Sequence, residues 1–326
     1  MRYIAAAALL VVLISPLYAA ERVAIEGTRV SLVPPGKFQK AENFQGFQLK
    51  DKNASILIME ITAPYGKFAE AFTKEGLASR GMKLLAKEAL PLKSGRGLLL
   101  SVSQNAYGTD FRKWIVVTGD NDTTVMITAV FPESFEKELS KTMKASILSF
   151  RLSEKKDSQG TEGLPFSIEI QPPLKLARRF GNNLLFSKNG EFPAQNEKDP
   201  VFIVGASVSS GLVVDDKKEY SLQRVKKVEQ VKDIAVESTA EVTIDGITGY
   251  EIVASGIDRK EGFKTLVYQV MLFKETDYFI IQGFSDEEEK GTYLPLFKKI
   301  AESFKKKAPS NKSGKGALGD CSRAAL

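Results

Sequence analysis

The sequence predicts an α+β fold, an antiparallel sheet flanked by helices, and it predicts this fold twice. A block of strand-like segments closed by a helix, residues 95–150, recurs at residues 246–304. Strand-like segments follow one another with few helices between them, which favours an antiparallel sheet over a doubly wound one. The length of 326 residues is also typical of two domains.

The two copies of the repeated block keep a nearly constant spacing. Gly97 and Gly249 are 152 positions apart, and Phe150 and Phe304, which end the two closing helices, are 154 positions apart. A drift of two positions is what one loop insertion would produce. We therefore expect two domains of one fold.

The segments before the first block predict a small sheet and one helix. Residues 28–33 read as a strand stopped by Pro34-Pro35-Gly36, and residues 43–49 as a second strand. Residues 55–61 hardly alternate, which is typical of a central strand covered on both faces. A helix is expected between Gly66 and Gly81, with the second glycine ending it.

Within the first block, glycines and an apolar stripe define the elements. Gly95 and Gly97 mark the start of a strand, and residues 119–122 form a turn between two later strands. The closing helix repeats an apolar side chain at every fourth position, and this face should lie on the sheet. These side chains are Phe135, Leu139, Met143 and Ile147.

A polar segment that contains glycine and lacks apolar periodicity, residues 153–165, is expected to be a linker. It divides a first domain, 21–152, from a second, 166–305. The second should open with strands at 166–170 and 200–205. A helix near 218–231, a strand at 234–244 and the repeated block then follow.

Residues 1–20 have the three parts of a secretory signal: Arg2, an apolar run over 4–14, and small residues at Ala19-Ala20. We expect export to the periplasm or the medium. An uncleaved anchor is the alternative, because residues 3–20 are nearly all apolar. Cys321 is the only cysteine, so an internal disulfide is impossible.

The net charge of +6 lies at the ends of the chain. Residues 305–326 carry a net +5 and Arg2 another +1, which leaves the two domains neutral. Nucleic-acid binders concentrate positive charge on a folded face or arm, so nucleic acid is not the expected partner. The basic tail, 306–326, is expected to be disordered, with at most weak contact to a membrane surface.

The residue types needed for common catalysis are missing. The chain has no histidine and one cysteine, which excludes Ser-His-Asp and Cys-His catalysis and the usual zinc and iron–sulfur sites. We therefore predict no enzyme activity, no cofactor and no metal. Serine-lysine hydrolysis is a remaining alternative, through Ser134 with Lys137 or Ser303 with Lys306, which match S-x-x-K.

One aromatic strand is the candidate ligand or partner surface. Phe111 and Trp114 lie on it beside Arg112 and Lys113. Aromatic strands usually belong to a core, yet the open face of such a sheet can also hold an apolar ligand or a peptide.

The order of elements, Pro34-Pro35-Gly36, Gly46-Phe47, Gly95-x-Gly97 and the Ser-Phe helix ends resemble the PsbP-like fold in both halves. This resemblance implies an α/β/α sandwich and an accessory or binding role without catalysis, but it transfers no functional residue. We expect an exported binding protein of the cell envelope. Its partner would be an envelope protein or, alternatively, a lipid or other small apolar molecule that the protein carries.

Overall fold

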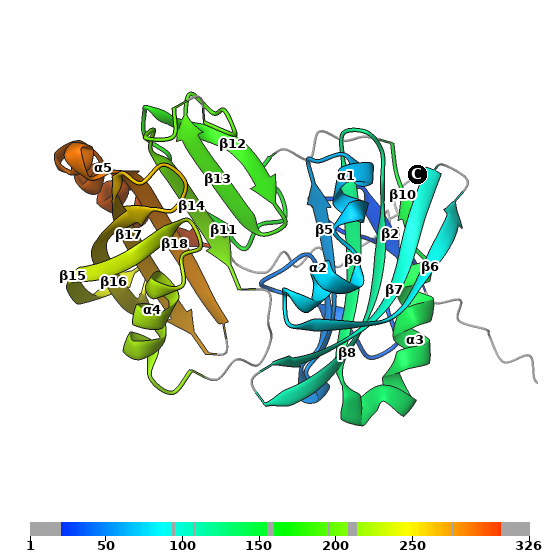
Figure 1. Cartoon of the computed structure of the whole chain (residues 1–326). Helices are drawn as coiled ribbons and strands as arrows, with labels where there is room; N and C mark the ends of the chain where they lie inside the picture. The colour runs from blue at the N-terminus through cyan, green and yellow to red at the C-terminus, as the bar shows by residue number, and fades with distance from the viewer. Residues whose placement is uncertain are drawn as a thin grey trace, which may run out of the picture.

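The computed structural model describes residues 21–92, 95–106, 108–154, 160–194, 196–207, 214–275 and 277–307 (Figure 1). The predicted signal, 1–20, and the tail beyond Lys307 lie outside the described residues. No helix of the described residues is long and apolar enough to cross a membrane.

The first half contains ten strands and three helices among its described residues. Its strands are β1 (Val23–Ala24), β2 (Val30–Leu32), β3 (Gln39–Lys40), β4 (Gly46–Leu49), β5 (Ala54–Ile61), β6 (Met82–Leu92), β7 (Gly95–Ala106), β8 (Thr109–Gly119), β9 (Thr124–Pro132) and β10 (Arg151–Leu152). Its helices are α1 (Tyr65–Glu70), α2 (Lys74–Ala78) and α3 (Glu136–Leu148).

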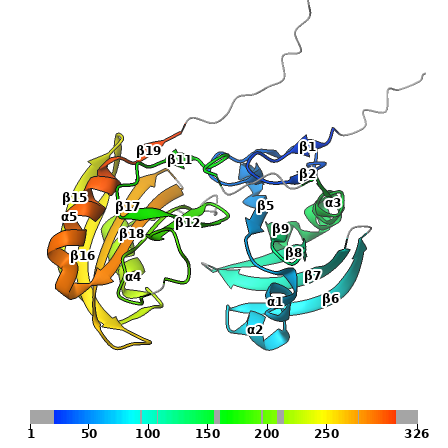
Figure 2. The same cartoon turned by 90° about the horizontal axis from the view of Figure 1, so that it is seen from above.

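Helices cover both faces of the first-half sheet, which runs β3-β4-β5-β9-β8-β7-β6. Leu139, Met143 and Ile147 of α3 are buried on one face, as their spacing predicted. Phe72 and Leu77, from the α1–α2 region, pack on the other face. Figure 2 shows α3 and the α1–α2 pair on opposite sides of β7 and β8.

The second half repeats this order of elements. Its strands are β11 (Phe166–Ser167), β12 (Leu174–Phe180), β13 (Asn183–Lys188), β14 (Val201–Ala206), β15 (Val231–Ile244), β16 (Ile247–Asp258), β17 (Lys264–Lys274), β18 (Asp277–Asp286) and β19 (Lys305–Lys306). Its helices are α4 (Lys217–Lys226) and α5 (Lys290–Glu302). The sheet runs β12-β13-β14-β18-β17-β16-β15, the order of the first half.

The correspondence extends to the small strands. β10 pairs with β2 just after the first closing helix, and β19 pairs with β11 just after the second. Helices α5 and α4 lie on opposite faces of β16 and β17 (Figure 2). The predicted fold class, an antiparallel sheet flanked by helices in each half, is therefore confirmed.

The two half-sheets join edge to edge. β5 and β12 pair antiparallel at a single position, Ile61 with Phe180, and this bridge makes one 14-stranded sheet. The Asn182 side chain donates a hydrogen bond across the joint to the backbone oxygen of Asn43, and both residues are buried. A Cβ added at Gly181 would lie 3.1 Å from Cγ of Met59 in β5, so only a glycine fits closely here. The joint is thus built at the turn between β12 and β13.

The predicted linker is held at both of its described ends. Ser153 N donates to Arg29 O at 2.8 Å, and Leu164 is 3% exposed within the second core. The structured second half also extends past its predicted end, since Lys307 N donates to Pro165 O at 2.9 Å. The polar composition of 153–165 hid these contacts because backbone groups make several of them.

The structure differs from the sequence prediction in several elements, and two differences matter most. The strand predicted at 166–170 is only β11, and the helix predicted near 218–231 ends at Lys226. The single helix between Gly66 and Gly81 is two short helices, because Thr73 caps a new helix by accepting from Gly76 N at 3.0 Å. Residues 174–188 form a β-hairpin that the sequence interpretation did not include. This hairpin is the element that reaches the first half.

Candidate binding surface at the edge of β12

The β12–β13 hairpin is built by a two-residue turn. Phe180 pairs with Asn183, so that Gly181 and Asn182 form the loop. Gly181 has φ +56°, a conformation that glycine adopts without strain. A Gly-Asn pair between apolar runs is a hairpin signal, so the sequence could have revealed this element.

Most of β12 has a strand partner on one side only. β5 and β12 overlap at their C-terminal ends and run in opposite directions, so β12 extends past the end of β5. Among the described residues, those at 174–176 and 178–179 pair with β13 alone, and the register shifts at Ala177 between them. In Figure 1, β12 lies on the side of the second half that faces the first. Its outer backbone groups have no strand partner among the described residues.

Apolar and aromatic side chains flank this free edge. Leu176 on β12 is 36% exposed, and Phe192, from the segment between β13 and β14, is 42% exposed. The Arg178 guanidinium carbon lies 5.5 Å from the ring centre of Phe180 and 5.3 Å from that of Phe192. We call Leu176, Arg178, Phe180, Phe192 and the unpaired backbone of 174–179 the β12 edge.

A buried arginine fixes the end of the hairpin. Arg179 is 7% exposed, and its Nε donates to Gly181 O at 2.9 Å. Its Nη1 donates to the backbone oxygens of Gly160 and Glu162 at 3.0 and 2.8 Å. Burial lowers the pKa of Arg179, although nearby Glu162 and Glu60 partly oppose this effect. The hydrogen bonds of Arg179 therefore fix the end of the hairpin that carries the β12 edge.

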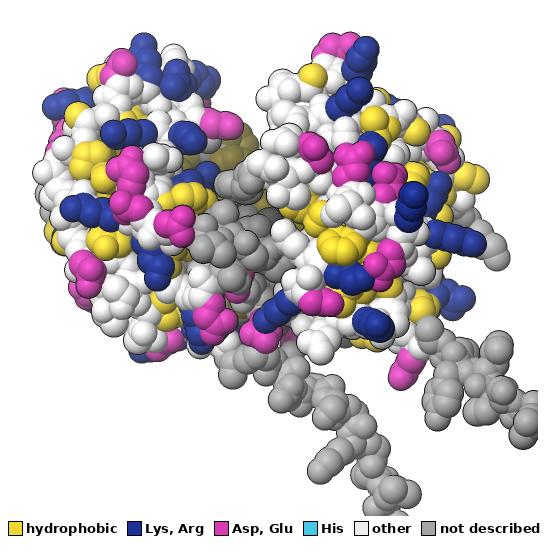
Figure 3. Space-filling model, turned by 90° about the horizontal axis from the view of Figure 1, so that it is seen from below, with side chains coloured by type: hydrophobic (Ala, Val, Ile, Leu, Met, Phe, Trp, Pro, Cys, Tyr) yellow, Lys and Arg dark blue, Asp and Glu magenta, His cyan; other side chains and the backbone are white. Residues whose placement is uncertain are grey.

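The β12 edge carries positive charge that the described residues do not neutralise. Lys175 and Arg178 form no ion pair within the described ranges, and Lys175 is exposed. On the face drawn in Figure 3, basic and acidic side chains are interspersed. The side chains of Lys175 and Arg178 therefore give the β12 edge a positive charge.

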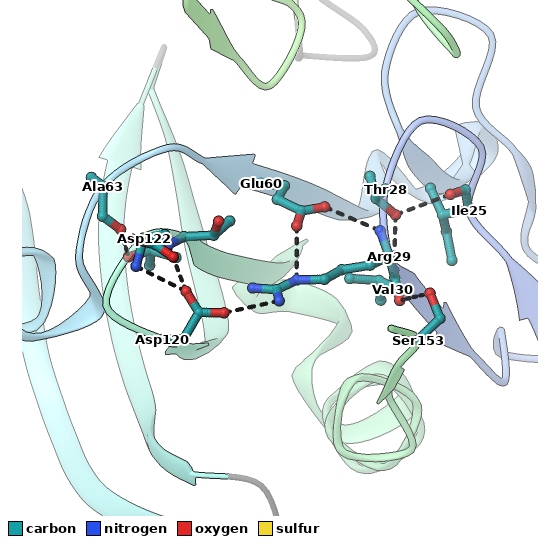
Figure 4. Close-up of polar contacts among 11 residues, drawn as sticks. Ile25, Thr28, Arg29, Val30, Glu60, Ala63, Asp120, Asp122 and Ser153 are labelled. Atoms are coloured by element: carbon teal, nitrogen blue, oxygen red, sulfur yellow. Dashed lines mark hydrogen bonds and ion pairs between the residues drawn. The ribbon is translucent and has the colours of Figure 1, made fainter. Parts of the chain in front are cut away.

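A buried ion-pair cluster holds the first strand region to the sheet. Arg29 lies 2.8 Å from Glu60 of β5 and 3.1 Å from Asp120, which follows β8 (Figure 4). Burial would raise the pKa of Asp120. The backbone N–H groups of Asp122 and Thr123 and the Arg29 guanidinium outweigh it and place this pKa below its usual range. The cluster joins three segments, so we assign it a structural role.

Phe111 and Trp114 do not form one surface. Trp114 packs on α3, where its Nε1 donates to Ser140 Oγ at 3.0 Å and Lys144 Nζ lies 4.2 Å from its ring centre. Phe111 is three positions earlier in β8 and points to the opposite face. Burial lowers the pKa of Lys113, which shares that face. The role of Phe111 and Trp114 in ligand or partner binding stays a prediction.

One S-x-x-K serine has a structural use. Ser303 Oγ donates to Ile300 O at 2.6 Å and accepts from Glu169 N at 2.9 Å, which fixes the chain after α5. Ser134 is exposed in the short 3₁₀ turn before α3. These contacts explain Ser303 without catalysis.

No family model and no curated protein matches the chain. Its structure is similar to that of the cyanobacterial PsbP protein of Synechocystis sp. PCC 6803, with 11% identity, a TM-score of 0.29, and coverage of 44% of this chain and 82% of that one. It is similar to LpqN of Mycobacterium tuberculosis, described as involved in cell envelope biogenesis, with 14% identity, a TM-score of 0.32, and coverage of 43% and 82%.

A third similar structure spans both halves. It is the immunity protein TplEi of the T6SS of Pseudomonas aeruginosa, with 10% identity, a TM-score of 0.29, and coverage of 87% of this chain and 96% of that one. The structures found thus include the PsbP-like fold that the sequence resembles. A likeness of this degree indicates no function.

Proposed function

We propose that this protein is an exported, non-enzymatic binding protein of the cell envelope that engages another protein through the β12 edge. The observation that carries the proposal is an unpaired strand edge with exposed apolar side chains on both of its faces. Native proteins protect edges with irregularities and charges, and this edge has a register shift at Ala177 and the charges of Lys175 and Arg178. A partner strand would therefore have to complement these charges as well as the apolar side chains.

The expected binding mode is strand addition. A partner segment in extended conformation would form backbone hydrogen bonds with residues 174–179, which gives affinity without sequence preference. Leu176 and Phe192 would then contact its side chains on opposite faces of the enlarged sheet. Aromatic and arginine side chains dominate binding energy in many interfaces, and Arg178 and Phe192 are of these types.

The charge of the β12 edge defines the partner further. Lys175 and Arg178 are positive and form no ion pair among the described residues. A partner segment with apolar residues and at least one Asp or Glu would complement both properties. We therefore propose an acidic, β-prone protein segment.

The proposal can be tested by selecting random phage-displayed peptides on the purified chain. Leu176→Lys and Phe192→Ser should each weaken the selected peptides at least about tenfold, as expected of central interface residues. Leu85→Lys and Leu148→Lys are matched controls, because these leucines are 42% and 38% exposed outside the β12 edge.

Two results would contradict the proposal. Peptides whose binding resists both edge substitutions would bind elsewhere. A concentration-dependent dimer that Leu176→Lys dissociates would assign the edge to a second copy of the chain.

The envelope location rests on residues 1–20. When the protein is expressed in a Gram-negative bacterium, it should appear in the periplasm. Its mass should be that of a chain whose first residue is Ala20 or Glu21. A full-length protein in the membrane fraction would support the alternative of an uncleaved anchor.

A further inference from the structure

The apolar cores of the two halves are separate. The described residues form four clusters of buried apolar side chains, and every cluster lies wholly within one half or the segment that enters it. The helices follow the same division, because α1, α2 and α3 pack on the first-half sheet and α4 and α5 on that of the second (Figure 1). The sheet therefore crosses the joint without a shared apolar core to hold the halves together.

The strand pairing at the joint is also minimal. β5 pairs with β12 at one position, Ile61 with Phe180. Within the first half, β5 pairs with β9 at seven positions, and within the second, β14 pairs with β18 at six. One residue pair of an antiparallel ladder exchanges at most two backbone hydrogen bonds. Strand pairing therefore holds each half together far more firmly than it holds one half to the other.

Polar side chains make further contacts across the joint. Asn182 donates to Asn43 O, and the Asn43 side chain in turn donates to the Asp277 carboxylate at the start of β18. Burial raises the pKa of Asp277, although the hydrogen bond from Asn43 and the charges of Lys50 and Lys306 oppose this effect. Burial of an ionised carboxylate costs free energy. These contacts therefore favour a closed joint less than apolar packing would.

The two halves also leave space between them. A cavity of about 560 Å³ is bounded by residues 23–26 and 40–47 of the first half, by residues 161–165 and by Lys307. Well-packed interfaces resemble protein interiors, which contain few voids larger than a water molecule. The joint is therefore loosely packed over part of its area.

The segment that connects the halves is fixed to a different half at each of its described ends. Ser153 N donates to Arg29 O of the first half at 2.8 Å. Arg179 of the second half donates to the backbone oxygens of Gly160 and Glu162. The covalent connection therefore does not clamp the two halves at one point.

We infer that the joint is a hinge about which the two halves rotate as rigid bodies. Domains with a small, polar interface commonly move relative to each other, and the single strand pair, the polar contacts and the cavity fit this class. The hinge turns at the backbone contact of Gly27 with Glu162, where an added Cβ would lie only 2.3 Å from the Glu162 oxygen. Opening separates Ile61 from Phe180.

Opening of the hinge lengthens the free edge of β12. With Phe180 released from Ile61, the edge extends to the last residue of the strand. A longer edge pairs with a longer partner segment, so the hinge regulates binding at the β12 edge. This regulation rests on the proposed strand addition, whereas the hinge itself does not.

A disulfide across the joint closes the hinge reversibly. The variant Ile61→Cys/Phe180→Cys, made with Cys321→Ser to remove the only native cysteine, places two thiols on directly opposite residues. Their Cα atoms are about 4.5–5.5 Å apart in an antiparallel pair, a distance that a disulfide spans. Small-angle X-ray scattering should give a larger radius of gyration for the reduced form than for the oxidised form. Superimposable scattering curves would overturn the hinge.

A second variant tests the hinge without a disulfide. Asn182→Ala removes the side-chain hydrogen bond across the joint and should increase the radius of gyration. Asn183→Ala is the matched control, because the Asn183 side chain donates to Phe180 O within the second half, and it should scatter like the parent. A parent-like curve for Asn182→Ala would overturn the assignment of this hydrogen bond as a contact that closes the hinge.

The peptides selected on the chain test the regulation of the β12 edge. They should bind the reduced form of the Ile61→Cys/Phe180→Cys variant at least about threefold more tightly than the oxidised form, because the disulfide removes the open state. Both forms lack the Phe180 ring, so the comparison isolates the disulfide. Equal affinities with different scattering curves would overturn the regulation but not the hinge. Peptides that resist Leu176→Lys and Phe192→Ser would instead contradict the strand addition, whatever the scattering curves show.

Discussion

The two halves of the molecule differ in the side chains that fix the short strand pair next to the closing helix. We call this place the corner of each half. In the first half, Arg29 and Glu60 form an ion pair at 2.8 Å with side chains 8% and 9% exposed. In the second half, Phe166 and Phe279 pack on Phe304 with ring centres 5.8 and 4.9 Å away. The corners correspond because β2 pairs with β10 as β11 pairs with β19.

The same strand pairing therefore forms with an ion pair in one half and with packed aromatic rings in the other. An ion-pair corner depends on both partners and on pH, whereas an aromatic corner depends on buried volume. Trp114 is the only tryptophan and lies in the first half, so its fluorescence reports on that half.

The largest expected effect is on the aromatic corner. Phe304→Ala should lower the free energy of unfolding by about 3–5 kcal/mol, because a fully buried ring leaves a cavity. Phe150→Ala, at the equivalent place after α3, should cost about 1–2 kcal/mol because Phe150 is only half-buried. Urea denaturation followed by circular dichroism measures both, and equal losses would contradict the comparison.

Next in size is the ion-pair corner. Arg29→Met leaves the buried Glu60 carboxylate without its cation and should cost about 3 kcal/mol. The double variant Arg29→Met/Glu60→Met should recover most of this loss, because no unpaired charge stays buried. The urea midpoint of Trp114 fluorescence measures both. A double variant as unstable as the single one would show that packing, and not charge pairing, holds the corner.

Equivalent glycines should differ as well. An added Cβ at Gly249 would lie 1.9 Å from Met271 O, whereas at Gly97 the nearest atom, Leu92 Cδ1, would be 3.2 Å away. Gly249→Ala should therefore cost about 1–3 kcal/mol, and Gly97→Ala less than about 1 kcal/mol. Thermal unfolding measures the melting temperatures of the two variants. A larger loss of melting temperature for Gly97→Ala than for Gly249→Ala would contradict this prediction.

The smallest effect is the acid sensitivity of the first half. The folded-state pKa of Asp120 lies below its usual value of 3.8, so its ionised form stabilises the fold above that pH. This contribution is lost as pH falls through the lowered pKa. The urea midpoint of Trp114 fluorescence should drop less between pH 5 and pH 3 for Asp120→Asn than for the parent. An identical drop of the urea midpoint in both proteins would show that Asp120 does not cause the acid sensitivity.

The sequence predicted the elements whose signals are local. The apolar stripe of α3 and the turn at 119–122 are formed by neighbouring residues, and both lie where the pattern indicated. The α1–α2 break was missed because Thr73 capping competes with an otherwise continuous helix. The β12–β13 hairpin had a signal, Gly181-Asn182, that the interpretation did not use.

Local sequence patterns could not predict the candidate binding surface. The open edge of β12 exists because β5 meets it at one residue pair, which no spacing in the sequence specifies. Phe111 and Trp114 were grouped because they share a strand, but three positions along a strand place two side chains on opposite faces.

Hydrogen exchange across residues 174–180 tests the proposed strand addition most directly. The measurement compares the chain alone with the chain saturated by a peptide selected on it. Strand addition predicts that the backbone amides of 174–179 that point away from β13 exchange fast in the free chain and slowly in the complex. Unchanged exchange at β12, with protection elsewhere, would contradict the proposed binding surface.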